Sequence, residues 1–309
     1  MKQFVAAYPD GPGSVVIFVG RLCTRGDQVT FMKEHRKTGR LRVPHDNLAV
    51  STRMVFQNEA QLRGARLEQE FDKVDAVLRD KIIVSTIVVF GSSRILSPEA
   101  ADALSNGETT ETRNSERARR RTELSKWYDL ARSFGRTVSE RGGAIGPEGI
   151  PRRNVIATGG GPGIMEAANR GAAEAGAPSI GFNIILPKDQ PSNPYTTPEL
   201  TFLFHYFAMR KMHLALRANA LAVFPGGFGT LDELFEILTL KQTHKGVQIP
   251  ILLFDRAYWQ RVISFQALVD FDMISPDEIE LFDLVDTVEE AWNVLLKRGL
   301  TGFSNDPSA

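Results

Sequence analysis

The sequence predicts an α/β fold in which a parallel β-sheet is covered by helices. From residue 82 onward, short apolar runs alternate with stretches whose apolar residues recur at helical spacing. The runs are continuous rather than alternating, which is typical of parallel strands buried on both faces. Three of the runs end in glycine-rich turns, as the strands of βα units often do. Together these observations predict a doubly wound, Rossmann-like domain with helices on both faces of the sheet.

The first 80 residues differ from this pattern, and we predict that residues 1–80 form an N-terminal extension of unknown role. Apolar stretches at 14–20 and 28–32 could be strands, and the basic segment that follows, 33–40, is rich in turn-forming residues. Apolar positions at helical spacing then predict an amphipathic helix at 59–80.

The main domain is predicted to span residues 81–300, followed by a tail at 301–309. Its strands are expected at 82–90, 155–158, 179–184, 220–224, 249–254 and 281–285, and its helices at about 116–141, 164–171, 206–218, 230–238, 256–270 and 287–298. The polar segment 97–115 is predicted to be a loop or an insertion.

Composition narrows the class of protein. The 309 residues contain 37 basic and 37 acidic side chains, so no net charge favours nucleic acid or a membrane surface as a partner. The single cysteine, Cys23, excludes an intramolecular disulfide and offers no zinc-type cluster. No apolar run approaches the roughly 18 residues of a membrane span, and the first residues lack a secretory pattern. A cytoplasmic protein without a metal site is therefore expected.

The most informative stretch is residues 223–233, where an apolar run leads through a glycine turn into a helix. Gly226, Gly227 and Gly229 form the turn, and Thr230 places a hydroxyl in the first helical turn. Backbone N–H groups and the positive end of a helix dipole make such a turn an anion site. The functional interpretation is a phosphate cradle; the alternative is a capped helix after a tight turn.

Two other glycine turns are expected at the same edge of the sheet. One contains Gly91 and Ser92, and the other contains Gly160 and Gly161. In open α/β sheets the carboxyl ends of the strands surround the ligand crevice. Neither turn has the register of a dinucleotide fingerprint, and no triphosphate-binding P-loop is present. A monophosphate is therefore the predicted ligand, although each turn alone could be purely structural.

A basic pair, Arg210 and Lys211, lies early in the helix before the key strand and could reach the crevice. The alternative is a solvated pair on an exposed face. With the segment 225–233, which reads PGGFGTLDE, this pair resembles the LOG (lonely guy) family. That family was long described as lysine decarboxylases and carries the motif PGGxGTxxE. The resemblance covers roughly residues 84–298.

Membership would imply a phosphoribohydrolase that cleaves nucleoside 5′-monophosphates, such as AMP or cytokinin riboside monophosphates, into free base and ribose 5-phosphate. It also implies a homodimer and no cofactor. Arg210 and Glu233 match the catalytic pair, and Asp232 stands where many members have glutamate. The residues that match substrate-binding positions are Lys211, Gly226, Gly227, Gly229 and Thr230, and we add Asp232, Gly91, Ser92, Gly160 and Gly161 to the expected substrate site.

Cleavage of an N-glycosidic bond passes through an electron-poor sugar, which a nearby carboxylate stabilises. We expect Glu233 to have this role and to orient the attacking water, while the acid that protonates the leaving base is not assigned. A nucleotide sensor without turnover is the main alternative. Lysine decarboxylation would need pyridoxal phosphate on a lysine, and Lys211 is the one lysine beside the motif. Nothing in the sequence favours a molybdopterin carrier.

Overall fold

The computed structural model describes residues 2–9, 15–25, 28–38, 48–49, 62–107, 112–185, 192–246 and 248–301. The chain divides into two compact units, Met1–Asp46 with Thr52–Arg66 and Asn47–Ser51 with Leu67–Ala309. The first unit contains an antiparallel sheet of β1 (Lys2–Pro9), β2 (Val15–Arg25) and β3 (Gln28–Thr38), in that order. The prediction of a turn-rich segment after residue 32 is therefore wrong up to Thr38, because β3 continues through these residues.

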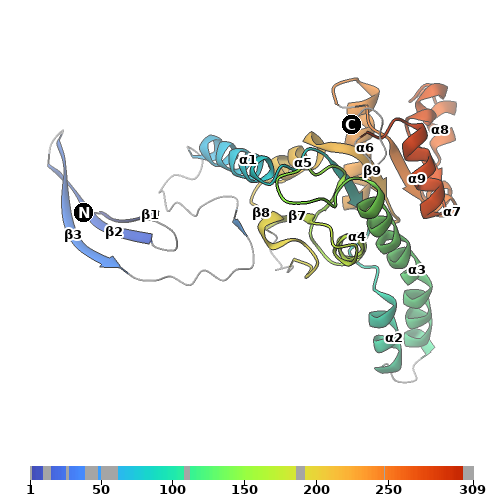
Figure 1. Cartoon of the computed structure of the whole chain (residues 1–309), viewed down its shortest axis with the longest axis horizontal. Coiled ribbons are helices and arrows are strands. Elements are labelled where there is room, and N and C mark those ends of the chain that lie inside the picture. Colours follow the sequence, from blue (N-terminus) through green and yellow to red (C-terminus); the bar gives the residue numbers. More distant parts are fainter. Residues whose placement is uncertain are drawn as a thin grey trace. The chain divides into compact units, whose positions relative to one another are not determined.

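The second unit is built on an eight-stranded sheet in which every strand pair is parallel (Figure 1). Its strands are β4 (Leu48–Ala49), β5 (Thr86–Phe90), β6 (Val155–Thr158), β7 (Ser179–Ile184), β8 (Thr201–Phe204), β9 (Ala218–Val223), β10 (Ile251–Phe254) and β11 (Asp283–Val285). Their order is β11-β10-β9-β5-β6-β7-β8-β4. The chain thus runs outward from β5 on one side and from β9 on the other, so the topological switch point lies between β5 and β9.

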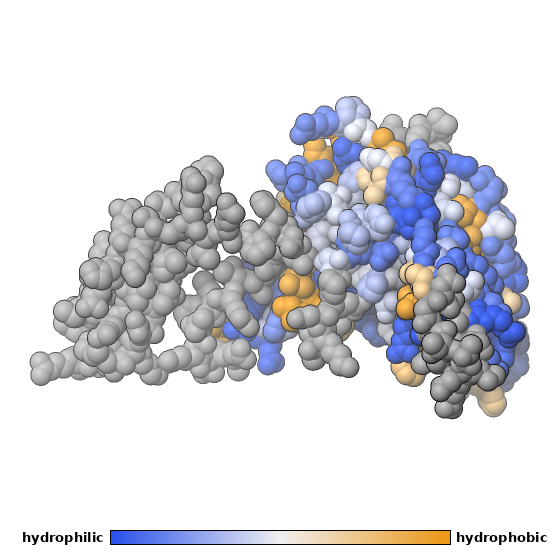
Figure 2. Space-filling model, turned by 90° about the horizontal axis from the view of Figure 1, so that it is seen from below, coloured by the Kyte–Doolittle hydropathy of each residue, from blue (hydrophilic) through white to orange (hydrophobic). Residues whose placement is uncertain are grey.

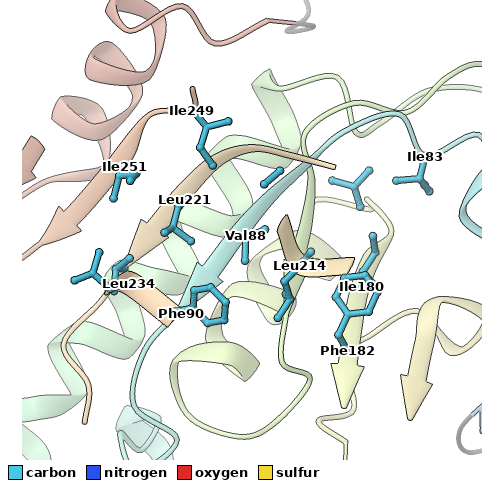
Figure 3. Packing of buried hydrophobic residues seen from close by; sticks show 14 of the residues in the cluster. Ile83, Val88, Phe90, Ile180, Phe182, Leu214, Leu221, Leu234, Ile249 and Ile251 are labelled. Atoms are coloured by element: carbon cyan, nitrogen blue, oxygen red, sulfur yellow. The ribbon is translucent and has the colours of Figure 1, made fainter. Parts of the chain in front are cut away.

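Helices cover both faces of the sheet, which confirms the predicted fold class. They are α1 (Arg63–Asp80), α2 (Pro98–Gly107), α3 (Thr112–Arg141), α4 (Ile164–Glu174), α5 (Phe207–Leu216), α6 (Phe228–Gln242), α7 (Arg256–Val262), α8 (Phe265–Asp270) and α9 (Val288–Lys297). In β5, Val88 and Phe90 join one buried core with Leu214 of α5 and Leu234 of α6 (Figure 3). Residues of α1 belong to the same core. Ile87 and Val89 join a second core with α3, α4 and α9. Successive strand residues therefore point to opposite layers.

Further element predictions were wrong in the second unit, where the helix predicted at 256–270 is two helices, α7 and α8. Residues 98–107 are a helix rather than a loop, because Ser97 caps it by accepting a hydrogen bond from the Ala100 N–H at 3.2 Å. Pro98 is its first residue, a position that proline favours. Strand β8 is not among the predicted strands, because four residues are too few for a periodicity signal.

Helix α1 packs with the second unit, although the sequence places it in the extension. Val74 and Leu78 are fully buried in the first core. Glu70, also buried, accepts hydrogen bonds from the backbone N–H groups of His205 (2.8 Å) and Tyr206 (3.3 Å) at the start of α5. A carboxylate at a helix N-terminus is stabilised by the helix dipole. Helix α1 therefore helps to hold α5 in place.

His213 on α5 gives the fold an acid-sensitive point. Its side chain is 1% exposed and lies against the ring of Phe71, with ring centroids 5.1 Å apart. Burial, assisted by the charge of Arg217 and opposed by Asp75, lowers the pKa of His213 to about 4.

No helix in the described part of the chain is long and apolar enough to span a bilayer.

As the pH falls, a buried histidine with a lowered pKa is protonated at a lower pH in the folded chain than in the unfolded chain. The free energy of unfolding should therefore be unaffected by protonation of His213 above pH 6.5. It should fall by up to roughly 3 kcal/mol as the pH is lowered toward 4. His213→Phe should lose this part of the acid dependence. Urea unfolding of both proteins at pH 7.5 and 4.5 measures it, and an equal drop in both would contradict the assignment.

Candidate active site

A cleft of about 800 Å³ lies at the carboxyl ends of the central strands, beside the switch point. The turns after β5, β6 and β9 all line it. Of the residues that the sequence singles out, the cleft brings together Gly91, Ser92, Gly161, Arg210, Gly226, Gly227, Gly229, Thr230, Asp232 and Glu233. Gly160 and Lys211 are not among its lining residues. The volume is in the range of small-ligand sites.

The three turns are tied to one another by backbone hydrogen bonds. The Ser92 N–H donates to the Pro225 carbonyl at 3.1 Å, and the Ile164 N–H donates to the Ser92 carbonyl at the same distance. Gly163, with φ of 74°, lets the second turn approach Ser92, because a side chain there would overlap the backbone of that residue. The turns after β5, β6 and β9 therefore form one rigid rim.

The N-terminus of α6 opens on the cleft. Gly227 is its N-cap residue and has no side chain that could accept a hydrogen bond from the first-turn N–H groups. Gly226 must be glycine, since a Cβ there would overlap the buried side chain of Thr230. The Tyr258 hydroxyl donates to the Gly226 carbonyl at 2.6 Å and fixes the turn. This geometry is suited to an anion.

Arg210 extends from the first turn of α5 into the cleft. Its guanidinium lies on Gly159, where a Cβ would overlap Nη2. Its Nε is buried and has no hydrogen-bond partner among the described residues. Burial lowers the pKa of Arg210, and the charge of Glu233 opposes that shift. An arginine stays charged under such conditions, so its unpaired N–H calls for an acceptor.

Glu233 lies in the second turn of α6 and is only 7% exposed. Burial raises the pKa of Glu233 to about 7, even though Lys211 and Arg210 both act to lower it. Within the described chain, no direct ion pair joins Glu233 to either cation. A carboxyl group with this pKa can accept or give a proton at neutral pH.

Lys211 is held beside the cleft rather than in it. Its ammonium group lies 2.7 Å from a carboxylate oxygen of Asp232 and 2.7 Å from one of Glu236. Burial alone would lower the pKa of Lys211, but these two carboxylates outweigh it and raise the pKa. Lys211 is therefore a positive charge that two carboxylates hold near Glu233 and outside the lining of the cleft.

Several lining residues were not singled out by the sequence, namely Arg94, Met165, Asn183, Ile184, Phe207 and Val262. Most of them stand at a strand end or a helix start, which is the one signal that could have identified them. Within the described ranges, no group of three or more His, Cys, Asp or Glu side chains could hold a metal ion.

Part of this unit is similar to a known family model. Residues 165–295 match the family model described as "possible lysine decarboxylase". The search of curated proteins found no match. The solved structure of TM1055, a Northeast Structural Genomics Consortium target, is 21% identical over 69% of this chain and 99% of that chain, with a TM-score of 0.41. The molybdenum cofactor binding protein from the phototrophic bacterium Rippkaea orientalis is 15% identical over 70% of this chain and 96% of that one, also with a TM-score of 0.41.

The family description implies pyridoxal phosphate, which such chemistry would hold as a Schiff base with a lysine. No lysine in the described part of the chain lines the cleft. Lys211, the nearest by sequence, is paired with two carboxylates and has a raised pKa, which disfavours the neutral amine that a Schiff base requires. The residues present do not fit that cofactor.

Proposed function

We propose that this chain is a nucleoside 5′-monophosphate phosphoribohydrolase of the LOG family, which its sequence resembles and whose members are also described as possible lysine decarboxylases. The observation that carries the proposal is the pair of Glu233 and Arg210. A buried carboxyl group with a pKa of about 7 and a buried arginine with an unpaired N–H share one cleft. Functional sites are where such perturbed groups concentrate.

The 5′-phosphate is proposed to bind at the start of α6. Gly226, Gly227, Gly229 and Thr230 line the cleft there, and the helix dipole favours an anion. Ser92, tied to the same turn, adds a hydroxyl group. Binding energy from the phosphate, far from the reacting carbon, then serves to hold the ribose in a reactive position.

At C1′ the glycosidic bond breaks, and its electron pair leaves with the base. A water oxygen forms the new bond to C1′, and the Glu233 carboxylate accepts the proton that this water loses. The departing base takes one proton from solvent. Arg210 holds a ribose hydroxyl and the water in position, since a guanidinium is a poor proton donor. The negative charge of Glu233 stabilises the electron-poor sugar of the transition state.

The test is to incubate the purified chain with AMP, GMP, CMP, UMP and adenosine, and to detect free base by chromatography. Release from a monophosphate but not from adenosine is expected, because adenosine lacks the anchoring phosphate. No release from any nucleotide, together with measurable nucleotide binding, would favour the alternative of a nucleotide sensor.

A homodimer is part of the proposal through the family resemblance. On α6, Phe228 is 92% exposed and Phe235 is also exposed. Figure 2 shows that, on the face it displays, the described surface is mainly hydrophilic and its apolar residues form small separate patches. Phe228 and Phe235 are the α6 residues that a second copy would cover.

A further inference from the structure

Among the polar side chains that line the cleft and have no role in the proposed mechanism, one is buried. Asn183 is the penultimate residue of β7, lines the cleft and is 6% exposed. Its Nδ2 is buried and has no hydrogen-bond partner among the described residues. Buried polar groups in native proteins are nearly always paired, so an unpaired donor beside a cleft indicates that a ligand supplies the acceptor.

The amide of Asn183 is held in place by the backbone around it. Gly160 has a φ of 70°, and a Cβ at that position would overlap the Asn183 amide group. The turn is itself fixed, because the Gly160 N–H donates to the Thr158 hydroxyl at 2.9 Å and the Asn193 N–H donates to the Gly160 carbonyl at 2.8 Å. The amide is therefore preorganised for a partner.

The position of this amide indicates which part of a nucleotide it meets. The Arg210 guanidinium lies on Gly159, and the Asn183 amide lies on the adjacent Gly160. Arg210 acts at the ribose in the proposed mechanism, and Asn183 of β7 packs on the next residue of the same turn, so Asn183 is assigned to the group attached to C1′. That group is the base.

Apolar side chains complete this part of the cleft. Ile184 follows Asn183 at the end of β7, Met165 comes from α4, and Phe207 is the first residue of α5. Flat apolar rings are bound by such surfaces, with a small number of polar groups that fix their orientation. Asn183 is the polar group in this part of the cleft that could form hydrogen bonds with the edge of the ring.

We infer that Asn183 recognises the N7 and 6-amino edge of adenine in the substrate. Nδ2–H donates to N7 while Oδ1 accepts from the amino group, which is the bidentate pairing that asparagine makes with adenine. Pyrimidines lack N7, and the 6-oxo group of guanine would face Oδ1, acceptor against acceptor. The inference rests on the proposed function, to which it adds the residue that recognises the base. Donation to N7 also stabilises the electron pair that the base carries away.

The test compares the binding of AMP and 7-deaza-AMP, in which a C–H group replaces N7. Calorimetry uses the full chain carrying Glu233→Gln, so that nucleotide is not consumed, with Asn183 either present or changed to leucine, which has a similar volume. With Asn183, 7-deaza-AMP should bind roughly 10- to 100-fold more weakly than AMP. With Asn183→Leu the two should bind alike, and ribose 5-phosphate should bind equally to both proteins.

Asn219→Leu is the matched control, because Asn219 lies near the start of β9, at the opposite edge of the sheet. It should keep the full discrimination. Asn183→Asp, which also removes the donor, replaces the leucine variant if that protein does not fold. Discrimination that survives in both Asn183 variants overturns the inference, as does an equal loss of ribose 5-phosphate binding. N7-dependent binding without base release from wild-type protein would instead overturn the proposed hydrolase alone.

Discussion

Glu233→Gln is expected to lower kcat for AMP hydrolysis by roughly 10²-fold or more while AMP binding is retained. Glutamine keeps the size of the side chain but cannot accept a proton from water or stabilise positive charge on the sugar. For the wild type, kcat/KM should fall below pH 7, where the Glu233 carboxylate with its pKa of about 7 becomes protonated. Steady-state kinetics from pH 5 to 9 measure both effects.

Glu236→Gln is the matched control, since Glu236 lies on the same helix but binds Lys211 rather than lining the cleft. Its effect on kcat should stay below about tenfold, because it acts on Glu233 only through charge. A Glu233→Gln protein that turns over AMP at the wild-type rate would rule out the proposed mechanism.

The same variant has a stability effect of predictable sign. The pKa of Glu233 is raised on folding, so the unfolded chain loses its proton near pH 4.5 and the folded chain near pH 7. Stability therefore falls as pH rises through this window. Glu233→Gln should match the wild type at pH 4.5 and be more stable at pH 8 by up to roughly 3 kcal/mol. If Glu233→Gln makes the protein more stable and less active, Glu233 has a catalytic role and not a structural one.

Arg210→Met is expected to lower kcat/KM by roughly 10²- to 10³-fold. Methionine fills the space over Gly159, but it has no N–H group to hold the ribose and no charge to oppose that of Glu233. The kcat term should carry most of the loss, because the interaction is proposed to strengthen in the transition state. Loss of the cation should also raise the pKa of Glu233 further, which moves the acidic limb of the pH profile upward.

Arg256→Met provides the comparison, since Arg256 is half-exposed and its ion pairs lie outside the cleft. It should change kcat/KM little. If Arg210→Met raises KM and leaves kcat unchanged, Arg210 binds substrate without contributing to the chemical step.

The sequence contains enough local information for the sheet and for the glycine turns. Strands β6 and β7 begin and end at the predicted residues, because each is a short apolar run between turn residues. The two-sided packing follows from the same continuous apolar runs.

The parts of the site that could not be predicted depend on tertiary contacts. Nothing near Lys211 in sequence shows that Asp232 and Glu236 will bind it, since both come from a helix more than 20 residues away. The raised pKa of Glu233 depends on burial by neighbouring elements. Asn183 belongs to no motif, and its unpaired amide is visible only when Gly160 lies against it.

The buried Glu70 carboxylate makes the start of α5 electrostatically different from the start of α6. Two helices, α5 and α6, begin at the same edge of the sheet, and each start attracts negative charge. At α5 the protein supplies that charge itself through the buried Glu70 carboxylate. The start of α6 receives no such internal anion from its capping residue. The start of α6 is therefore the helix start at this cleft where an anion is not already supplied by the protein. If the substrate is a nucleotide, as proposed, we expect its phosphate to lie toward α6 and its base toward Phe207 at the start of α5.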